Sequence, residues 1–145
     1  MSGSMAKYII DASSIFKLLS SASPTAQNLL ENSSITDLTL FEIGNVLYKR
    51  KDSSIKEMPV EKVMALSKVI GNIIREITRL PITATEIPNI LSIAINKKTT
   101  FYDASYIYVC SREKLSLISE DLDLRRKAGE DKIKAYALMD VQPDQ

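Results

Sequence analysis

The chain carries four acidic residues that each lie close to the end of a short apolar segment: Asp11, Glu42, Asp103 and Asp121. It contains no histidine and a single cysteine, Cys110, which lies in an apolar run and is expected to pack in the core. Serine and cysteine triads, histidine-based ribonucleases and nearly all catalytic zinc sites need imidazole or thiolate groups, so the sequence excludes them. Any hydrolytic chemistry would run on carboxylates, whose oxygens suit hard cations such as Mg²⁺ and Mn²⁺.

Short β-rich apolar runs alternate along the chain with segments of helical apolar spacing. We expect strands over residues 7–10, 33–38, 77–82, 115–119 and 132–138. We expect helices over residues 13–19, 24–30, 39–47, 59–75, 86–96, 100–112 and 122–128, the last closed by Gly129. Such short apolar strands are typical of a parallel sheet covered on both faces. The pattern therefore predicts a three-layer α/β/α sandwich with a mostly parallel, about five-stranded central sheet.

The predicted elements bring the four acids to one edge of this sheet. Asp11 directly follows the first strand, and Asp121 lies just past the fourth. Glu42 and Asp103 are expected in the first turns of their helices, whose N-termini would face the same edge. Carboxylates gathered without a paired cation repel one another, and a bound divalent metal ion is the usual compensation.

Each acid also has a purely structural explanation. Glu42 follows Thr39 by three positions, in a pattern typical of a helix capping box, and Asp103 follows a threonine at the same distance. Asp11 and Asp121 each precede a predicted helix that they could cap. Capping does not require the acids to share one end of the sheet, so it accounts less well for the four taken together.

Length and composition are those of an ordinary globular domain, with 145 residues, 45% apolar residues and a net charge of +1. Residues 1–4 precede a second methionine and are expected to be an expression remnant, which leaves residues 5–145 as a single domain. The sequence lacks an apolar run of the roughly 20 residues that a membrane span needs. We therefore expect a cytoplasmic protein without a membrane partner.

Four segments resemble, in order and spacing, the motifs of the PIN-domain family. These segments, which together span almost the whole chain, are Tyr8–Ser14, Leu40–Leu47, Thr99–Tyr106 and Leu117–Leu124. In the fourth segment three acids compete for the family's aspartate position, namely Glu120, Asp121 and Asp123. Asp121 is preferred, because Ser119 and Leu124 then stand at the family's offsets. Within the family, the chain is most similar to VapC-type toxins of prokaryotic toxin–antitoxin pairs.

The resemblance implies a metal-dependent endoribonuclease that hydrolyses RNA phosphodiester bonds. Asp11, Glu42 and Asp103 would hold one Mg²⁺ or Mn²⁺, directly or through water, and Asp121 would shape a second, weaker site. Ser13 would position a water molecule or a phosphate oxygen.

Four further residues lie in or near these motifs. Asn45 and Ser119 would act by resemblance as hydrogen-bond partners behind the acids, although Asn45 is equally well explained as a polar residue on an exposed helix side. Tyr106 and Tyr108 cannot share a helix face, so packing rather than base stacking is favoured for at least one of them.

The resemblance also implies partners. An RNA substrate, a small antitoxin protein and a second copy of the chain in a homodimer are expected, with apolar surface on the early helices and on helix 59–75 as the contact region. One alternative is a housekeeping PIN nuclease in RNA processing, and another is a catalytically inactive PIN-like binding module. A phosphohydrolase with an aspartyl nucleophile is disfavoured, because Ser13 stands where a second aspartate would be needed.

Overall fold

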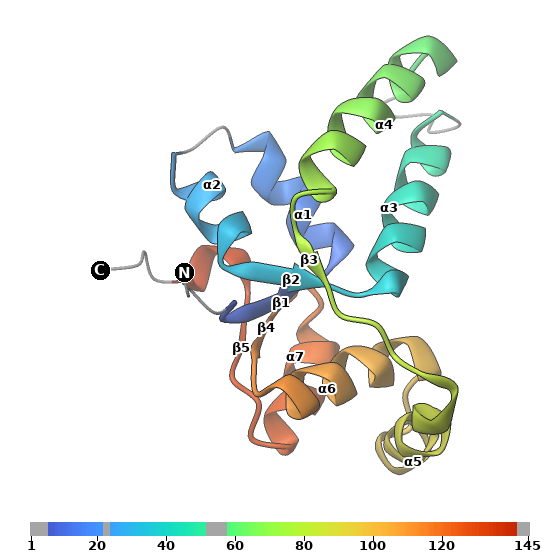
Figure 1. Ribbon diagram of the computed structural model, residues 1–145, viewed down its shortest axis with the longest axis vertical. Coiled ribbons are helices and arrows are strands. Elements are labelled where there is room, and N and C mark those ends of the chain that lie inside the picture. The colour runs from blue at the N-terminus through green and yellow to red at the C-terminus, as the bar shows by residue number, and fades with distance from the viewer. Residues whose placement is uncertain (1–5, 22–23, 52–57, 142–145) are drawn as a thin grey trace.

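The computed structural model describes residues 6–21, 24–51 and 58–141, so the expected expression remnant at residues 1–4 lies outside the described residues. One five-stranded sheet forms the centre, with strand order β3-β2-β1-β4-β5 and parallel pairing throughout. Its strands are β1 (Tyr8–Ile10), β2 (Ser33–Ile35), β3 (Thr78–Arg79), β4 (Ser116–Ile118) and β5 (Ala135–Tyr136). The predicted parallel sheet is confirmed (Figure 1).

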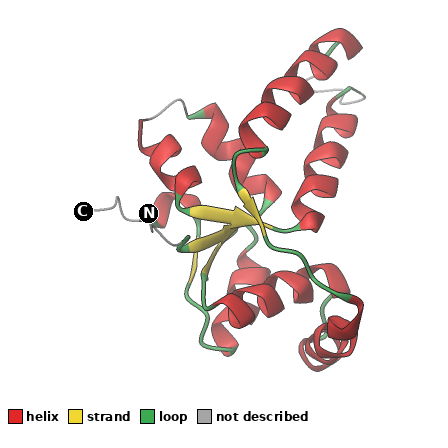
Figure 2. Cartoon of the chain, in the orientation of Figure 1, coloured by secondary structure: helices red, strands yellow, loops and turns green. Residues whose placement is uncertain are grey.

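Helices cover both faces of the sheet and complete the predicted three layers. The helices are α1 (Ala12–Ser20), α2 (Pro24–Glu31), α3 (Asp37–Arg50), α4 (Val60–Ile74), α5 (Ile87–Lys97), α6 (Phe101–Glu113) and α7 (Leu122–Glu130). Two short 3₁₀ helices cover Ala84–Glu86 and Leu138–Asp140. Figures 1 and 2 show α1 to α4 on one side of the strands and α5 to α7 on the other.

Successive residues of the central strands enter opposite cores, because side chains alternate along a strand. Ile10 and Ile118 pack in the core that α1 to α4 cover, whereas Ile9 and Leu117 pack against α6 and α7. All four side chains are fully buried. This burial on both faces explains why the strands read as uninterrupted apolar runs.

The expected N-cap of the third helix, Thr39, is wrong by three residues. Thr36 has extended backbone angles and serves as the N-cap, so α3 begins at Asp37 and β2 ends at Ile35. The Thr36 N–H donates to the Thr39 hydroxyl over 3.2 Å, which makes Thr39 the third residue of the helix rather than its cap. Glu42 therefore lies in the second turn and is not the capping-box residue.

The expectation that Gly129 ends α7 is wrong, because the helix continues to Glu130. The left-handed conformation that ends such helices is taken by Lys132 instead, with φ of 63°. Its N–H donates to the Gly129 carbonyl over 3.0 Å. Within the described ranges, none of the helices combines the length and the apolar character required to cross a membrane.

Candidate active site

A cavity of about 200 Å³ opens at the carboxyl edge of the central strands. The structure brings all four predicted acids to it, one from each of four segments of the chain. The cavity is lined by Asp11, Ala12, Ser13, Glu42, Val46, Asp103, Tyr106, Asp121 and Leu124.

Asp11 both caps a helix and lines the cavity. Its Oδ1 accepts the N–H of Ser14 and the hydroxyl of Ser13, each over 3.1 Å, at the N-terminus of α1. Both bonds are made by one oxygen, which leaves Oδ2 for a ligand. The structural explanation for this acid is correct, and it does not compete with a role in the cavity.

Asp121 has the same double position at the start of α7. Its Oδ1 accepts the N–H of Leu124 over 3.2 Å, and its own N–H donates to the Ser119 hydroxyl over 3.0 Å. Ser119 is fully buried and lies at the end of β4, behind the acid. It therefore holds the backbone of Asp121 rather than facing the cavity itself.

The carboxylate of Asp103 projects from the first turn of α6. The N-cap of this helix is Thr100, whose hydroxyl accepts the Asp103 N–H over 3.0 Å. The hydroxyl of Thr99 donates to Asp103 Oδ2 over 3.5 Å. The capping bond thus uses the backbone of Asp103 and leaves its side chain to the cavity.

Glu42 reaches the cavity from α3 and is held by a tyrosine. The Tyr106 hydroxyl donates to Glu42 Oε1 over 2.5 Å. Tyr106 is only 1% exposed, so it is a packed side chain and cannot stack on a base. Its contact with Glu42 was missed in the sequence, although Tyr106 stands one helical turn after Asp103 and thus on the same face of α6.

Charges of one sign dominate the cavity. Burial raises the pKa of Glu42, against the hydrogen bond from Tyr106, and the negative charges of Asp11 and Asp103 raise it further. Burial and the charge of Asp121 likewise raise the pKa of Asp103. Of the described residues that line the cavity, none is a lysine or an arginine. The donor set therefore fits a divalent cation, whose charge would offset this repulsion.

The two competing acids of the fourth motif are engaged elsewhere. Glu120 Oε1 lies 2.6 Å from Lys17 Nζ, and this hydrogen bond lowers the pKa of Glu120. Asp123 pairs with Lys127 over 2.9 Å and with Arg126, and its pKa is also lowered, chiefly by Lys127. Neither acid belongs to the described lining of the cavity, so Asp121 is the acid of this motif that reaches it.

Two further features bear on the site. Asn45 is exposed on α3 and stands outside the described lining of the cavity, which is the position expected of an ordinary surface polar residue. In the part of the chain that the structure describes, no three acidic or cysteine side chains converge closely enough to hold a metal ion. Mg²⁺ keeps several of its water ligands in proteins, so the wide spacing fits an ion held partly through water.

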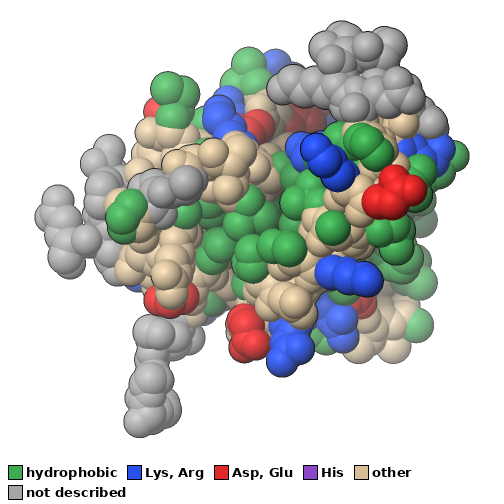
Figure 3. All heavy atoms as spheres, turned by 90° about the horizontal axis from the view of Figure 1, so that it is seen from above, with side chains coloured by type: hydrophobic (Ala, Val, Ile, Leu, Met, Phe, Trp, Pro, Cys, Tyr) green, Lys and Arg blue, Asp and Glu red, His purple; other side chains and the backbone are tan. Residues whose placement is uncertain are grey.

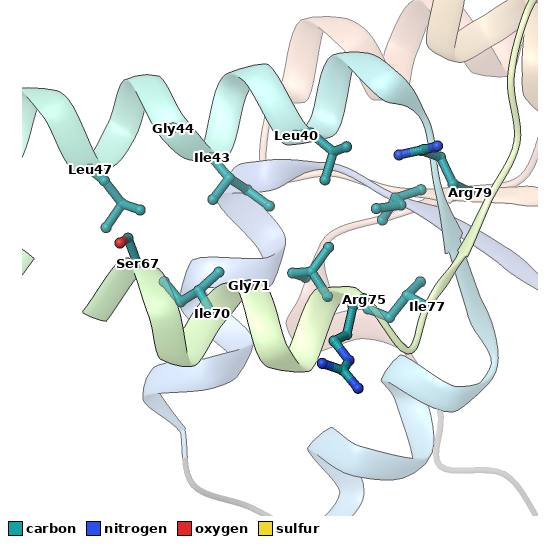
Figure 4. Close-up of a pocket in the computed structure, with 12 residues that line it drawn as sticks. Leu40, Ile43, Gly44, Leu47, Ser67, Ile70, Gly71, Arg75, Ile77 and Arg79 are labelled. Atoms are coloured by element: carbon teal, nitrogen blue, oxygen red, sulfur yellow. The ribbon is translucent and has the colours of Figure 1, made fainter. Parts of the chain in front are cut away.

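A second depression, about 680 Å³ in volume, runs between α3 and α4. Figure 4 shows apolar side chains of the two helices facing one another across it, among them Leu47, Ile43 and Ile70, with Arg75 and Arg79 toward one end. Seen from the side that α1 to α4 form, the molecule carries hydrophobic side chains at its surface (Figure 3). We call this depression the α3–α4 groove. It is larger than the acidic cavity, but it offers no carboxylates among its described lining and suits a partner better than hydrolysis.

Known proteins resemble this chain in sequence and in fold. A curated relative named Exonuclease VapC9, from Pyrobaculum aerophilum, is 29% identical over 126 residues, which are 83% of this chain and 85% of the relative. The crystal structure of a protein from the same organism superimposes with a TM-score of 0.73 at 27% identity, covering 86% of this chain and 87% of the other.

More distant structures share the fold. FitAcB from Neisseria gonorrhoeae has a TM-score of 0.63 at 13% identity and covers 92% of this chain and 99% of its own. A toxin–antitoxin complex from Klebsiella pneumoniae has a TM-score of 0.57 at 17% identity, with coverage of 96% and 99%. The family model of the PIN domain matches residues 8–130. Because this match covers most of the chain, and the four acids gather at the sheet edge, the chain belongs to the PIN-domain family.

Proposed function

We propose that this chain is a divalent-cation-dependent endoribonuclease that hydrolyses RNA phosphodiester bonds. The observation that carries the proposal is the convergence of Asp11, Glu42, Asp103 and Asp121 on one cavity that has no positive charge in its described lining. The name of the Pyrobaculum aerophilum relative supports nuclease activity.

Asp11, Glu42 and Asp103 would hold Mg²⁺ or Mn²⁺, partly through water, and Asp121 would shape a second, weaker site. When bound, the cation would lower the pKa of a coordinated water molecule toward neutral and would offset negative charge on the phosphate. Ser13 is exposed at the cavity, and its hydroxyl lies 3.1 Å from Asp11 Oδ1. It would accept a hydrogen bond from the attacking water in this arrangement, or donate to a phosphate oxygen once its proton turns away from Asp11.

RNA cleavage should require added Mg²⁺ or Mn²⁺ and should stop in chelator, in Asp11→Asn and in Asp103→Asn. Asp123→Asn is the matched control, because this nearby acid pairs with Lys127 outside the described lining of the cavity. Undiminished cleavage by both cavity variants, or equal loss in the control, would refute the assignment of the site.

The position of cleavage needs a separate test, because the relative is named an exonuclease. A circular RNA has no end, so an endonuclease opens it and an exonuclease leaves it intact. We expect the wild-type chain to open the circle in the presence of Mn²⁺. Degradation of linear RNA alone would correct the proposal to an exonuclease.

The biological role that we propose is that of a VapC-type toxin held inactive by a small antitoxin protein. The Klebsiella pneumoniae neighbour is a toxin–antitoxin complex, which supports such a partner. The α3–α4 groove would receive an apolar antitoxin segment whose acidic residues meet Arg75 and Arg79 at the groove's end. A homodimer is proposed as well, and its test is the molar mass in solution.

The product of a short reading frame directly upstream is the antitoxin candidate. It should bind the purified chain and inhibit cleavage, and Leu40→Asp, at an exposed position in the groove, should weaken that binding. A housekeeping RNA-processing nuclease would cleave with no such gene present. An inactive binding module would retain RNA without cleaving it.

A further inference from the structure

Glu42 stands at the end of a chain of hydrogen bonds that begins at the backbone of α3. The Thr36 N–H donates to Thr39 Oγ1 over 3.2 Å. Thr39 Oγ1 lies 2.9 Å from the Tyr106 hydroxyl, which in turn lies 2.5 Å from Glu42 Oε1. Thr39 and Tyr106 are 0% and 1% exposed, so water cannot replace either partner.

The hydroxyl protons in this series of hydrogen bonds can be arranged in only one way. An ionised carboxylate accepts hydrogen bonds but cannot donate one, so the single hydroxyl proton of Tyr106 goes to Glu42. The Thr39 hydroxyl must then donate to Tyr106, while its oxygen accepts the Thr36 N–H. Each bond polarises the next toward the carboxylate.

This series of hydrogen bonds also connects two layers of the fold. Thr39 and Glu42 lie on α3, whose buried side chains pack in the α1 to α4 core, whereas Tyr106 lies on α6 in the core of the opposite face. Tyr106 comes three residues after Asp103, so a single turn of α6 supplies one acid to the cavity and a hydrogen bond to another. The relative position of Glu42 and Asp103 is therefore set by this contact.

We propose that Tyr106, itself oriented by Thr39, is a positioning residue that fixes Glu42 by Oε1 and turns Oε2 toward the cavity where the cation would bind. This inference rests on the proposed function. Loss of the Tyr106 hydroxyl leaves Glu42 in place but free to rotate, so the cavity loses preorganisation while the fold survives. Residues behind metal ligands typically change metal affinity or activity by about 10–100-fold when they are replaced.

The same helix provides a matched control. The Tyr108 hydroxyl donates to Glu86 Oε2 over 2.6 Å, which is a tyrosine–glutamate bond of the same kind. Tyr108 and Glu86 are not part of the described lining of the acidic cavity. Tyr108→Phe thus removes a comparable hydrogen bond from α6 without touching the acids.

The test is Mn²⁺ binding by calorimetry to the whole chain without RNA, with RNA cleavage measured in parallel. Tyr106→Phe should weaken Mn²⁺ binding by about 10–100-fold, whereas Tyr108→Phe should bind as the wild type does. Thr39→Val should weaken binding less, and Thr39→Ser, which keeps the hydroxyl, should recover most of that loss. The double variant Tyr106→Phe/Thr39→Val should bind about as weakly as Tyr106→Phe, because Thr39 reaches Glu42 through Tyr106.

Wild-type Mn²⁺ affinity in folded Tyr106→Phe would overturn the inference and leave the proposed function standing. Equal losses in Tyr106→Phe and Tyr108→Phe would also overturn it, since they would indicate a general packing effect. Should Tyr106→Phe fail to fold, equal binding by Thr39→Val and Thr39→Ser would overturn it. Absence of Mn²⁺ uptake by the wild-type chain would overturn the proposed function and the inference together.

Discussion

Replacing Asp11 by asparagine or by alanine separates the two tasks of this side chain. Asp11 caps α1 through Oδ1, which accepts the Ser14 N–H over 3.1 Å, and it is 7% exposed at the edge of the acidic cavity. Asparagine offers the same capping oxygen but carries no charge. Alanine offers neither.

The expected effects on stability follow from the cap. Asparagine and aspartate are about equally good N-caps. In chelator, the free energy of unfolding of Asp11→Asn should therefore lie within a few tenths of a kcal/mol of the wild-type value. Asp11→Ala leaves the Ser14 N–H without this acceptor and should lose about 1 kcal/mol. For a chain of this size, that loss corresponds to a fall in Tm of roughly 2–4 °C.

The assay combines urea unfolding in chelator with cleavage of RNA in Mn²⁺. Cleavage should be lost in both variants, although only Asp11→Ala is less stable. A loss of stability in Asp11→Asn as large as that in Asp11→Ala would refute the capping argument. Cleavage by Asp11→Asn at the wild-type rate would refute the need for charge at this position.

Three more predictions concern stability. The pKa values of Glu42 and Asp103 are raised above 4.5 and 3.8, so the folded chain binds more protons than the unfolded chain as these groups titrate. In chelator, Glu42→Gln should therefore gain stability relative to the wild type as the pH rises from about 4 toward 7; a difference that does not change with pH, measured by urea unfolding, would contradict this sign. Ser14 Oγ is buried and, in the described part of the chain, has no hydrogen-bond partner, so Ser14→Ala should raise the free energy of unfolding by about 1 kcal/mol. The space that a methyl group would take at Gly71 of α4 is open to 4 Å, so Gly71→Ala should stabilise the helix by about 1 kcal/mol and raise Tm; a lower Tm would contradict this.

Most of the architecture follows from the sequence because its signals are local and strong. The alternation of apolar strands with helices predicted the layers and the parallel sheet, and Ile9 and Ile10 show why, since each is fully buried on its own face. Helix ends were harder. Either Thr36 or Thr39 could serve as the N-cap of α3. Because β2 ends at Ile35, the helix begins directly after Thr36. At the end of α7, the left-handed position fell on Lys132 rather than on the nearby glycine.

In the candidate site, too, the features set by local sequence signals could be predicted, whereas contacts between distant residues could not. That Asp11 and Asp121 stand near one edge follows from the strand ends, which the sequence marks clearly. The contact between Tyr106 and Glu42 joins residues 64 positions apart, on helices of different layers, and no local pattern encodes such a contact. Ser119 was expected near the site, but its hydrogen bond to the backbone of Asp121 emerges only from the three-dimensional arrangement.

The most direct test of the central claim is anomalous diffraction from crystals of the chain soaked in Mn²⁺. We predict an anomalous peak inside the cavity, within direct or water-mediated reach of Asp11 and Asp103. The peak should disappear in crystals of Asp103→Asn. A cavity without manganese at saturating concentration, or manganese bound only at Glu120 or Asp123, would contradict it.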